Sequence, residues 1–269
     1  MGVTISSVLG DIMQNAPQEA LEFAKLPRAE RIRIICEEEN SIVNQEEYDR
    51  IPCDKCKGKG YYYTEGETMW IRNECSCVAS RMALDYVESL GLLKDVKKCN
   101  FDSYIPYDEP TKQMKEVAMN YQDGWLYLAG QSGSGKTHLA YSIFGKMVKR
   151  HKAPKWFRWI QDSQEIKRVA SDEVEYDRLT KPLMTCSMLF IDDFFNVTPT
   201  DADIRLARVI LDYRYTNDLP TIITSELMLS ELNEIDDAIA GRIAEMGTVF
   251  QIRGTGHNYR MRKYNEQVS

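Results

Sequence analysis

The chain has 269 residues, 43% of them apolar and 28% charged, which is enough for one full α/β domain and a smaller module beside it. Its net charge of −7 argues against a protein that coats nucleic acid by bulk attraction, although a local basic strip is compatible with that charge. The longest stretch without a charged residue, Gly124 to Gly135, is far shorter than the ~20 apolar residues of a membrane span. We therefore expect a cytoplasmic protein that has no membrane partner.

The first part of the chain is predicted to be helical around a cysteine-rich segment. Residues 17–47 place apolar side chains at helical spacing among charged ones. Residues 51–77 hold turn-forming glycines and two short runs, YYY and TMWIR, which predict a hairpin. A loop-like stretch, NFDSYIPYDEP, follows a predicted helix over 78–90. We place the domain boundary at that loop, which gives domains 1–100 and 101–269.

The cysteine-rich segment carries the spacing of a zinc ribbon. Four thiols lie in a C-x₂-C pair and a C-x-C pair, eighteen residues apart, at Cys53, Cys56, Cys75 and Cys77. A tight cysteine cluster in a reducing compartment indicates metal rather than disulfides. Four thiolates fill the tetrahedral shell of Zn²⁺, so the ion is expected to be structural. The module is expected to dock a protein partner, with nucleic-acid binding through Lys55, Lys57 and Lys59 as the alternative.

Beyond the boundary the sequence alternates between strands and helices. Four short runs are predicted to be strands: WLYLAG, WFRWI, MLFID and TIIT. Amphipathic or mixed segments separate them. This alternation predicts an α/β domain with a mostly parallel sheet and helices on both faces. The helical segment before WFRWI ends in basic residues that interleave with aromatic ones. That stretch is either a DNA-contacting surface that stacks bases or a solvated helix end followed by a buried strand.

The strongest motif follows the first of these strands and opens a helix. It matches the phosphate-loop pattern G-x-x-x-x-G-K-[ST] at Gly130, Gln131, Ser132, Gly133, Ser134, Gly135, Lys136 and Thr137. Glycines let successive backbone N–H groups turn toward one phosphate, and the helix N-terminus adds a partial positive charge. We expect Lys136 to reach the β- and γ-phosphates of ATP and the Thr137 hydroxyl to bind Mg²⁺.

Two further strand ends supply the polar groups that such a phosphate site needs. The run MLFIDD ends in Asp192, expected to hold the Mg²⁺ shell, and Asp193, expected to polarise the attacking water. Aspartate at the second position is one methylene shorter than glutamate. The run TIITS ends in Thr224 and Ser225, either of which is a candidate for orienting the water.

Together these motifs resemble the replicative-helicase loaders of bacteria and their phages, an AAA+ branch close to replication-initiator and transposition-helper ATPases. The resemblance rests on GQSGSGKTHLA, LFIDD, TIITS and AGRI, covers about Phe101 to Lys263, and includes His138 directly after the phosphate loop. It implies an AAA+ ATPase domain with a short C-terminal lid region, preceded by the helical and zinc-ribbon-like module. It also implies three associations: with a hexameric replicative helicase, with single-stranded DNA, and between ATPase domains.

The resemblance assigns further roles and leaves alternatives open. It implies that Arg242 reaches the γ-phosphate bound by a neighbouring subunit. The stretch from Glu226 to Ser269 is too short for the full helical lid of larger AAA+ proteins, and Arg253 and Arg260 are the candidates for a second sensor arginine. A transposition helper that positions a transposase on DNA is the nearest alternative. A nucleotide-switched adaptor that hydrolyses ATP weakly is another, because Asp193 is short.

Overall fold

The computed structural model describes residues 17–253, which divide into two compact units. The first unit ends at Val78 and the second begins at Ala79. Within these residues no helix is both long and apolar enough to cross a membrane. The division precedes the predicted boundary at 100/101, because α5 (Cys77–Ser89) and α6 (Leu93–Lys98) contribute to the core of the second unit. Their side chains in that core are Ala83, Val87 and Val96.

The N-terminal unit combines short helices with the predicted hairpin. Its elements are α2 (Gln18–Lys25), α3 (Arg28–Ser41), α4 (Gln45–Arg50), β1 (Tyr61–Glu65) and β2 (Trp70–Glu74). Pro27 lies directly before α3, where a residue without an N–H costs no helical hydrogen bond. Asn40 of α3 pairs with the backbone of Tyr63 in both directions at 2.8 Å, which attaches the hairpin to the helix.

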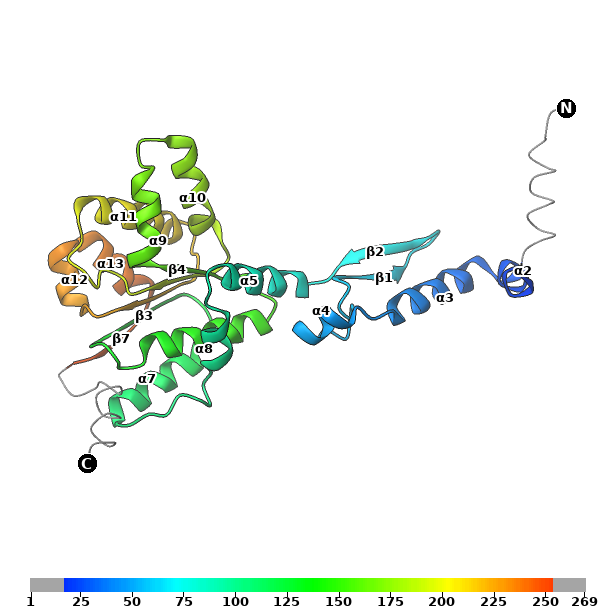
Figure 1. Ribbon diagram of the computed structural model, residues 1–269, viewed down its shortest axis with the longest axis horizontal. Coiled ribbons are helices and arrows are strands. Elements are labelled where there is room, and N and C mark those ends of the chain that lie inside the picture. The colour runs from blue at the N-terminus through cyan, green and yellow to red at the C-terminus, as the bar shows by residue number, and fades with distance from the viewer. Residues whose placement is uncertain (1–16, 254–269) are drawn as a thin grey trace. The chain divides into compact units, whose positions relative to one another are not determined.

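The second unit is a five-stranded parallel sheet covered by helices on both faces, as predicted (Figure 1). The strands run in the order β4-β5-β6-β3-β7. Their bounds are β3 (Trp125–Gly130), β4 (Lys155–Arg158), β5 (Leu189–Asp192), β6 (Thr221–Ser225) and β7 (Gly247–Ile252). The helices are α7 (Glu109–Asn120), α8 (Lys136–Lys149), α9 (Trp159–Arg168), α10 (Glu173–Thr185), α11 (Asp201–Thr216), α12 (Leu229–Ile235) and α13 (Asp237–Met246).

Strand β3 shows why the sheet needs two layers of helices. All six of its residues are buried, and its apolar side chains alternate between two separate clusters. Leu126 and Leu128 pack with α7 and α8, whereas Tyr127 and Ala129 pack with the α9–α13 side. Figure 1 shows these two groups of helices on opposite sides of the sheet. Because β3, β5 and β6 are parallel, their carboxyl ends lie at the same edge of the sheet, and the predicted site residues lie at that edge.

The stretch after β6, which the sequence assigned to a short lid region, forms α12, α13 and β7 up to Ile252. Strand β7 pairs with β3 over six residues, from Gly247 opposite Trp125 to Ile252 opposite Gly130. These elements therefore complete the sheet domain within the described part of the chain.

The aromatic residues next to the basic stretch are part of the core. Trp156 is 0% exposed and lies between Tyr141 and Phe190, with ring centroids 4.1 and 5.4 Å away. Phe157 and Trp159 are also buried, in the cluster on the other face. The prediction that these rings stack on DNA bases is therefore wrong, because they face the interior and not the solvent. The alternative, a basic helix end followed by a buried strand, describes this segment.

Candidate functional site

The phosphate loop joins β3 to α8 in a conformation that depends on glycine. Gly133 and Gly135 have φ angles of 78° and 94°, a region that other residues rarely adopt. A Cβ atom at Gly135 would also lie 2.5 Å from the ring of Tyr104. Lys136 is buried at the start of α8, and its Nζ donates to the carbonyl oxygens of Gly130 at 2.7 Å and Gln131 at 3.1 Å. The ammonium group is thus held inside the loop that would surround a phosphate.

Asp192 joins the phosphate loop to the neighbouring strand ends. Its Oδ1 accepts hydrogen bonds from Thr137 at 2.9 Å and from Thr224 at 2.6 Å. The Thr224 hydroxyl in turn accepts from the backbone N–H of Asp193 at 3.1 Å. Ser225 is directed elsewhere, donating to the Phe194 carbonyl at 2.6 Å. Of the two predicted sensor candidates, only Thr224 therefore contacts the acidic group of the site.

The environment of Asp192 opposes its ionisation. Burial, together with the nearby charge of Asp193, raises its pKa from 3.8 to about 6, although Thr224, Thr137 and Lys136 act in the opposite direction. A divalent cation would remove this penalty, because it favours the charged carboxylate. The Asp192 and Thr137 oxygens are also the hard ligands that Mg²⁺ prefers. These two residues would hold the ion.

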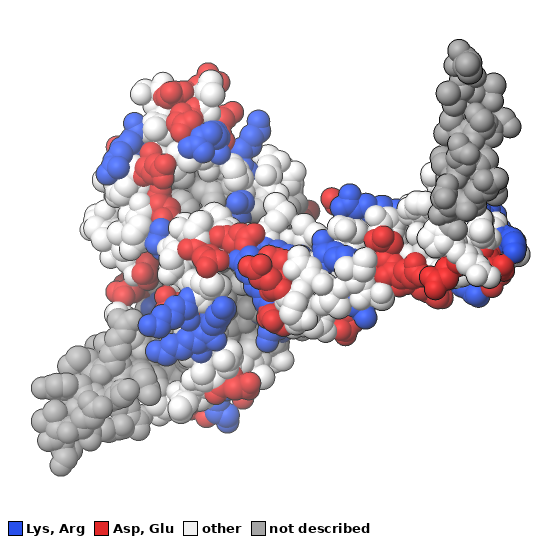
Figure 2. All heavy atoms as spheres, turned by 45° about the vertical axis from the view of Figure 1, so that its right-hand side comes forward, with Lys and Arg blue, Asp and Glu red and all other residues white. Residues whose placement is uncertain are grey.

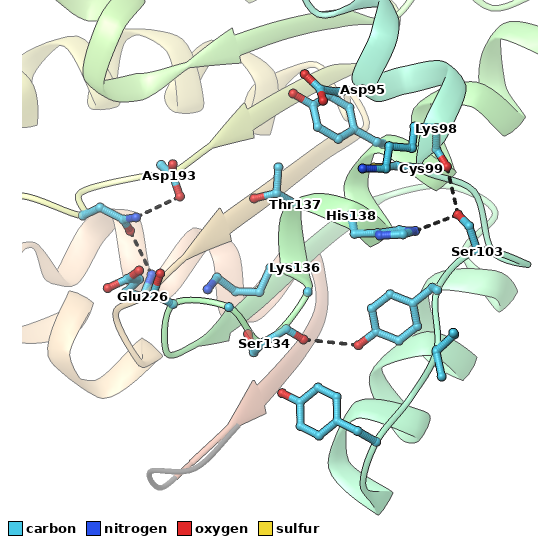
Figure 3. Close-up of a pocket in the computed structure, with 18 residues that line it drawn as sticks. Asp95, Lys98, Cys99, Ser103, Ser134, Lys136, Thr137, His138, Asp193 and Glu226 are labelled. Atoms are coloured by element: carbon cyan, nitrogen blue, oxygen red, sulfur yellow. Dashed lines mark hydrogen bonds between the residues drawn. The ribbon is translucent and has the colours of Figure 1, made fainter. Parts of the chain in front are cut away.

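Two carboxylates lie on one side of the site. Asp193 has a φ of 56°, and its Oδ1 accepts a hydrogen bond from Asn196 at 2.8 Å. The side-chain oxygen of Asn196 accepts from the backbone N–H of Glu226 at 3.0 Å. Figure 3 shows Asp193 and Glu226 on the same side of Lys136 and Thr137. Sequence reasoning did not single out Asn196 or Glu226; the position of Glu226, directly after β6, was the available signal.

A cavity of about 710 Å³ extends from these carboxylates across the phosphate loop, and Ser132 and Ser134 are among its lining residues. This volume lies in the range typical of ligand pockets. Its far wall was not predicted and comes from α6 and the following loop, with Asp95, Lys98, Cys99, Tyr104, Ile105 and Tyr107 (Figure 3). Such a mixed aromatic and polar wall could hold the base and ribose of a nucleotide.

His138 attaches this wall to the phosphate loop. Its Nε2 lies 3.0 Å from the carbonyl oxygen of Asn100 and 3.2 Å from the hydroxyl of Ser103. Tyr104 adds an edge-on ring contact with His138 and donates to the Ser134 carbonyl at 3.2 Å. Burial lowers the pKa of His138 below its usual 6.5, which favours the neutral ring.

The predicted arginines among the described residues lie outside this cavity. Arg242 on α13 lies 3.1 Å from Asp212 of α11, and its guanidinium lies over the ring of Tyr215. Arg253 is an exposed residue after β7, and Arg260 lies outside the described residues. Neither Arg242 nor Arg253 is among the described residues that line the cavity of the same chain.

The four predicted cysteines form a separate cluster in the N-terminal unit. Their sulfur atoms all lie within 4.8 Å of one another, and three of the four cysteines are buried. Zn–S bonds of about 2.3 Å in a tetrahedron imply S···S separations of about 3.8 Å. The Cys56–Cys77 and Cys53–Cys75 sulfurs lie 3.3 and 3.6 Å apart and no pair exceeds 4.8 Å, so small shifts of both signs accommodate the ion. Burial acts to raise the pKa of Cys56, but hydrogen bonds from Cys77 and Gly60 outweigh it and lower the pKa to about 7. The arrangement is compatible with a zinc site.

Comparison with known sequences agrees with this geometry. The sequence pattern of the family described as IstB-like ATP binding protein matches residues 79–267. The chain belongs to that family. The match covers the whole sheet domain and begins where the second compact unit begins. The five-stranded parallel sheet with its phosphate loop is the AAA+ P-loop fold, as the sequence resemblance implied.

Proteins similar to this chain include two of Bacillus subtilis (strain 168). The uncharacterized protein YqaM is 29% identical over 64% of this chain and 60% of its own length. The phage-like element PBSX protein XkdC is 26% identical over 81% of this chain and 88% of its own length. Among solved structures, a crystal structure of the DnaC helicase loader matches with a TM-score of 0.53 and 22% identity, over 59% of this chain and 98% of that chain. This likeness concerns the fold.

Proposed function

We propose that this protein is an ATP-dependent loader of a hexameric replicative DNA helicase onto single-stranded DNA. The observation that carries the proposal is the geometry of the candidate ATP site, where Asp192 accepts hydrogen bonds from Thr137 and Thr224 beside the phosphate loop. The fold likeness to the DnaC helicase loader supports it, since the matched region spans nearly all of that chain. The additional N-terminal unit gives the protein a second surface for a partner.

The site suggests a division of roles in ATP hydrolysis. The phosphate-loop N–H groups and Lys136 bind the β- and γ-phosphates, and Asp192 and Thr137 hold Mg²⁺, which neutralises charge on the phosphates. Asp193 orients and polarises the attacking water, and Thr224 fixes the position of Asp193 through its backbone N–H. Arg242 acts on the ATP of a neighbouring subunit, so hydrolysis depends on self-association of the ATPase domains.

The N-terminal unit docks the helicase, and the cysteine cluster holds a structural Zn²⁺. Few large apolar side chains of this unit are buried: Ile32 is the only aliphatic one among its described residues, apart from the buried cysteines. A metal that joins the turn at Cys53 to Cys75 and Cys77, which follow the hairpin, compensates for so small a core. Any single-stranded DNA binding depends on several copies aligned in an assembly, because one chain is acidic overall.

A binding experiment tests the proposal. Full-length protein and a fragment of residues 79–269 are immobilised and exposed to the purified replicative helicase of the host, with and without ATP. We expect the full-length chain to retain the helicase and the fragment to lose it. A fragment beginning at Phe101 is a poor choice, because it removes α5 and α6 from the core. Absence of helicase binding by the full-length chain contradicts the loader proposal.

A transposition helper is the second candidate, favoured by the resemblance of the phosphate-loop and strand-end motifs to that neighbouring branch of ATPases. It predicts binding to a transposase in place of a helicase, so the same immobilised protein exposed to each partner separates the two functions. A weakly hydrolysing adaptor is the third candidate, favoured by the short side chain of Asp193. It predicts partner binding that responds to ATP and is unaffected by Asp193→Ala.

A further inference from the structure

A groove in the N-terminal unit is lined by apolar side chains that no other described residue of that unit covers. It has a volume of about 350 Å³ and lies between α2, α3 and the turn of the hairpin. Phe23, Ile32 and Ile35 contribute from the helices. Met69 and Trp70 contribute from the hairpin, and they are 61% and 45% exposed. Large apolar side chains gathered in one groove indicate a binding surface more than isolated exposed residues do.

The hairpin turn holds its two apolar residues in a defined position. The backbone N–H of Gly66 donates to the Met69 carbonyl at 3.0 Å, and a Cβ atom at Gly66 would lie 2.5 Å from the same oxygen. Only glycine fits this tight turn. The hairpin is also attached to α3 by the two hydrogen bonds between Asn40 and Tyr63. The groove is thus already formed before a partner binds, which lowers the entropic cost of docking.

Arg31 indicates the charge of the missing partner. Its Nε is buried and has no hydrogen-bond partner among the described residues. Arg28 also lines the groove, and no acidic side chain is among the lining residues. Arg28 and Arg31 therefore give the groove a positive charge, and their guanidinium groups would bind a carboxylate of the partner through charge-assisted hydrogen bonds.

We infer that this groove binds an amphipathic helix of the replicative helicase, with its apolar side chains between Ile35 and Trp70 and an acidic side chain on Arg31. The inference rests on the proposed function for the identity of the partner. An apolar helix seated in a groove is a common mode of protein recognition, and the arginine sets its position along the groove.

The surroundings of the groove favour a protein over nucleic acid. Acidic side chains outnumber basic ones in residues 17–78, and α3 continues into Glu37, Glu38 and Glu39. Figure 2 shows a band of acidic side chains along one edge of this unit. A phosphate backbone would be repelled there, whereas a helix with an isolated acidic residue would not.

The test measures the affinity of the full-length protein for the purified host helicase in the presence of ATP. Met69→Ser and Trp70→Ser are each expected to raise the Kd by about tenfold or more, as for central apolar contacts of an interface. Arg31→Gln is expected to raise it by about five- to tenfold, with a smaller effect at high salt. Two matched controls, Ile42→Ser and Arg33→Gln, change exposed residues of the same types outside the groove and should leave the Kd unchanged. Circular dichroism establishes that each variant is folded.

The outcomes separate this inference from the proposed function. If the wild-type chain binds and the folded groove variants bind equally well, the groove inference is overturned and the loader function stands. If the wild-type chain does not bind the helicase, both are overturned. If the groove variants weaken binding to a fluorescent single-stranded oligonucleotide and leave helicase binding unchanged, the groove is a nucleic-acid surface and the inference is overturned.

Discussion

The phosphate site and the cysteine cluster both gather polar ligands from distant parts of the sequence, but they are supported differently. Asp192, Thr137 and Thr224 lie at strand and helix ends of a sheet whose two faces are covered by large apolar clusters. Three of the four cysteines form a buried cluster of their own, and among the described residues the partly buried side chains packed against it are Cys53 and Tyr62. The comparison teaches that the fold of the sheet domain positions the phosphate site. The cysteine cluster, by contrast, has to stabilise its own unit by binding metal.

The largest expected effect of this difference is on folding. We expect Cys56→Ser, or removal of metal by a chelator, to unfold residues 17–78 and to leave the sheet domain folded. Structural zinc contributes ~10–16 kcal/mol in small zinc-binding peptides, which exceeds what so small a core provides. Hydrogen exchange and metal analysis of the same sample measure the effect, and Cys99→Ser serves as control. Protection of residues 17–78 that persists without metal would contradict the comparison.

The next largest effect concerns the two carboxylates beside the phosphate loop. Asp193→Ala is expected to lower the single-turnover rate of ATP hydrolysis by about 10²-fold or more, the usual loss for a general base. Glu226→Gln, on the same side of the cavity, is expected to have a much smaller effect. A large loss of hydrolysis rate for Glu226→Gln and none for Asp193→Ala would assign the water-polarising role to Glu226. If neither substitution lowers the hydrolysis rate, the adaptor function is favoured.

Lys136→Ala tests the phosphate loop itself. The variant loses a charged donor to the phosphates, and hydrogen bonds of charged groups contribute about 1.5–3 kcal/mol. We expect the Kd for ATP to rise by roughly 10- to 100-fold, measured by calorimetry. Melting of the nucleotide-free protein is the control for folding. An unchanged Kd would mean that the cavity does not bind ATP through this loop.

The smallest expected effect is on stability and concerns Asp192. Removing its charge should stabilise the folded protein, although it should weaken binding of Mg²⁺ and ATP. Because folding raises the pKa of Asp192 from 3.8 to about 6, the free energy of unfolding falls as the pH rises from about 4 to about 6, and the loss is complete above that pH. Asp192→Asn is therefore expected to raise the free energy of unfolding of the nucleotide-free protein by up to about 3 kcal/mol at pH 8. At pH 4 the gain should disappear, since Asp192 is then protonated in the folded state.

The same variant should weaken binding of Mg²⁺ and ATP. Denaturant titrations at pH 4 and 8 and a binding titration measure the two effects together. A variant that is less stable at pH 8 would show that Asp192 is part of the structural framework rather than a strained functional group.

The sequence predicted the parts of this molecule that depend on local patterns. The glycines and Lys136 of the phosphate loop form a contiguous motif, β3 and β5 are mostly apolar runs, and β6 is a short run of β-branched residues that ends in Ser225. Strand β7 was not predicted, because Gly247, Thr248 and Gln251 break its apolar pattern and pairing with β3 stabilises it instead.

Other features required the fold. The choice of Thr224 over Ser225 depends on which way each side chain points from β6, and the sequence left both open. The cavity wall at Tyr104 comes from an irregular loop that lies against Gly135 only after folding. The unit boundary at Val78 depends on helices that pack on a core formed later in the chain.

The central claim, that this protein uses ATP to place a helicase on single-stranded DNA, is tested most directly by an unwinding assay. A forked DNA covered with single-stranded DNA-binding protein is incubated with the host helicase, with or without the full-length chain. We predict that unwinding requires the wild-type chain and is lost with Lys136→Ala. Equal unwinding with and without the chain would contradict the claim.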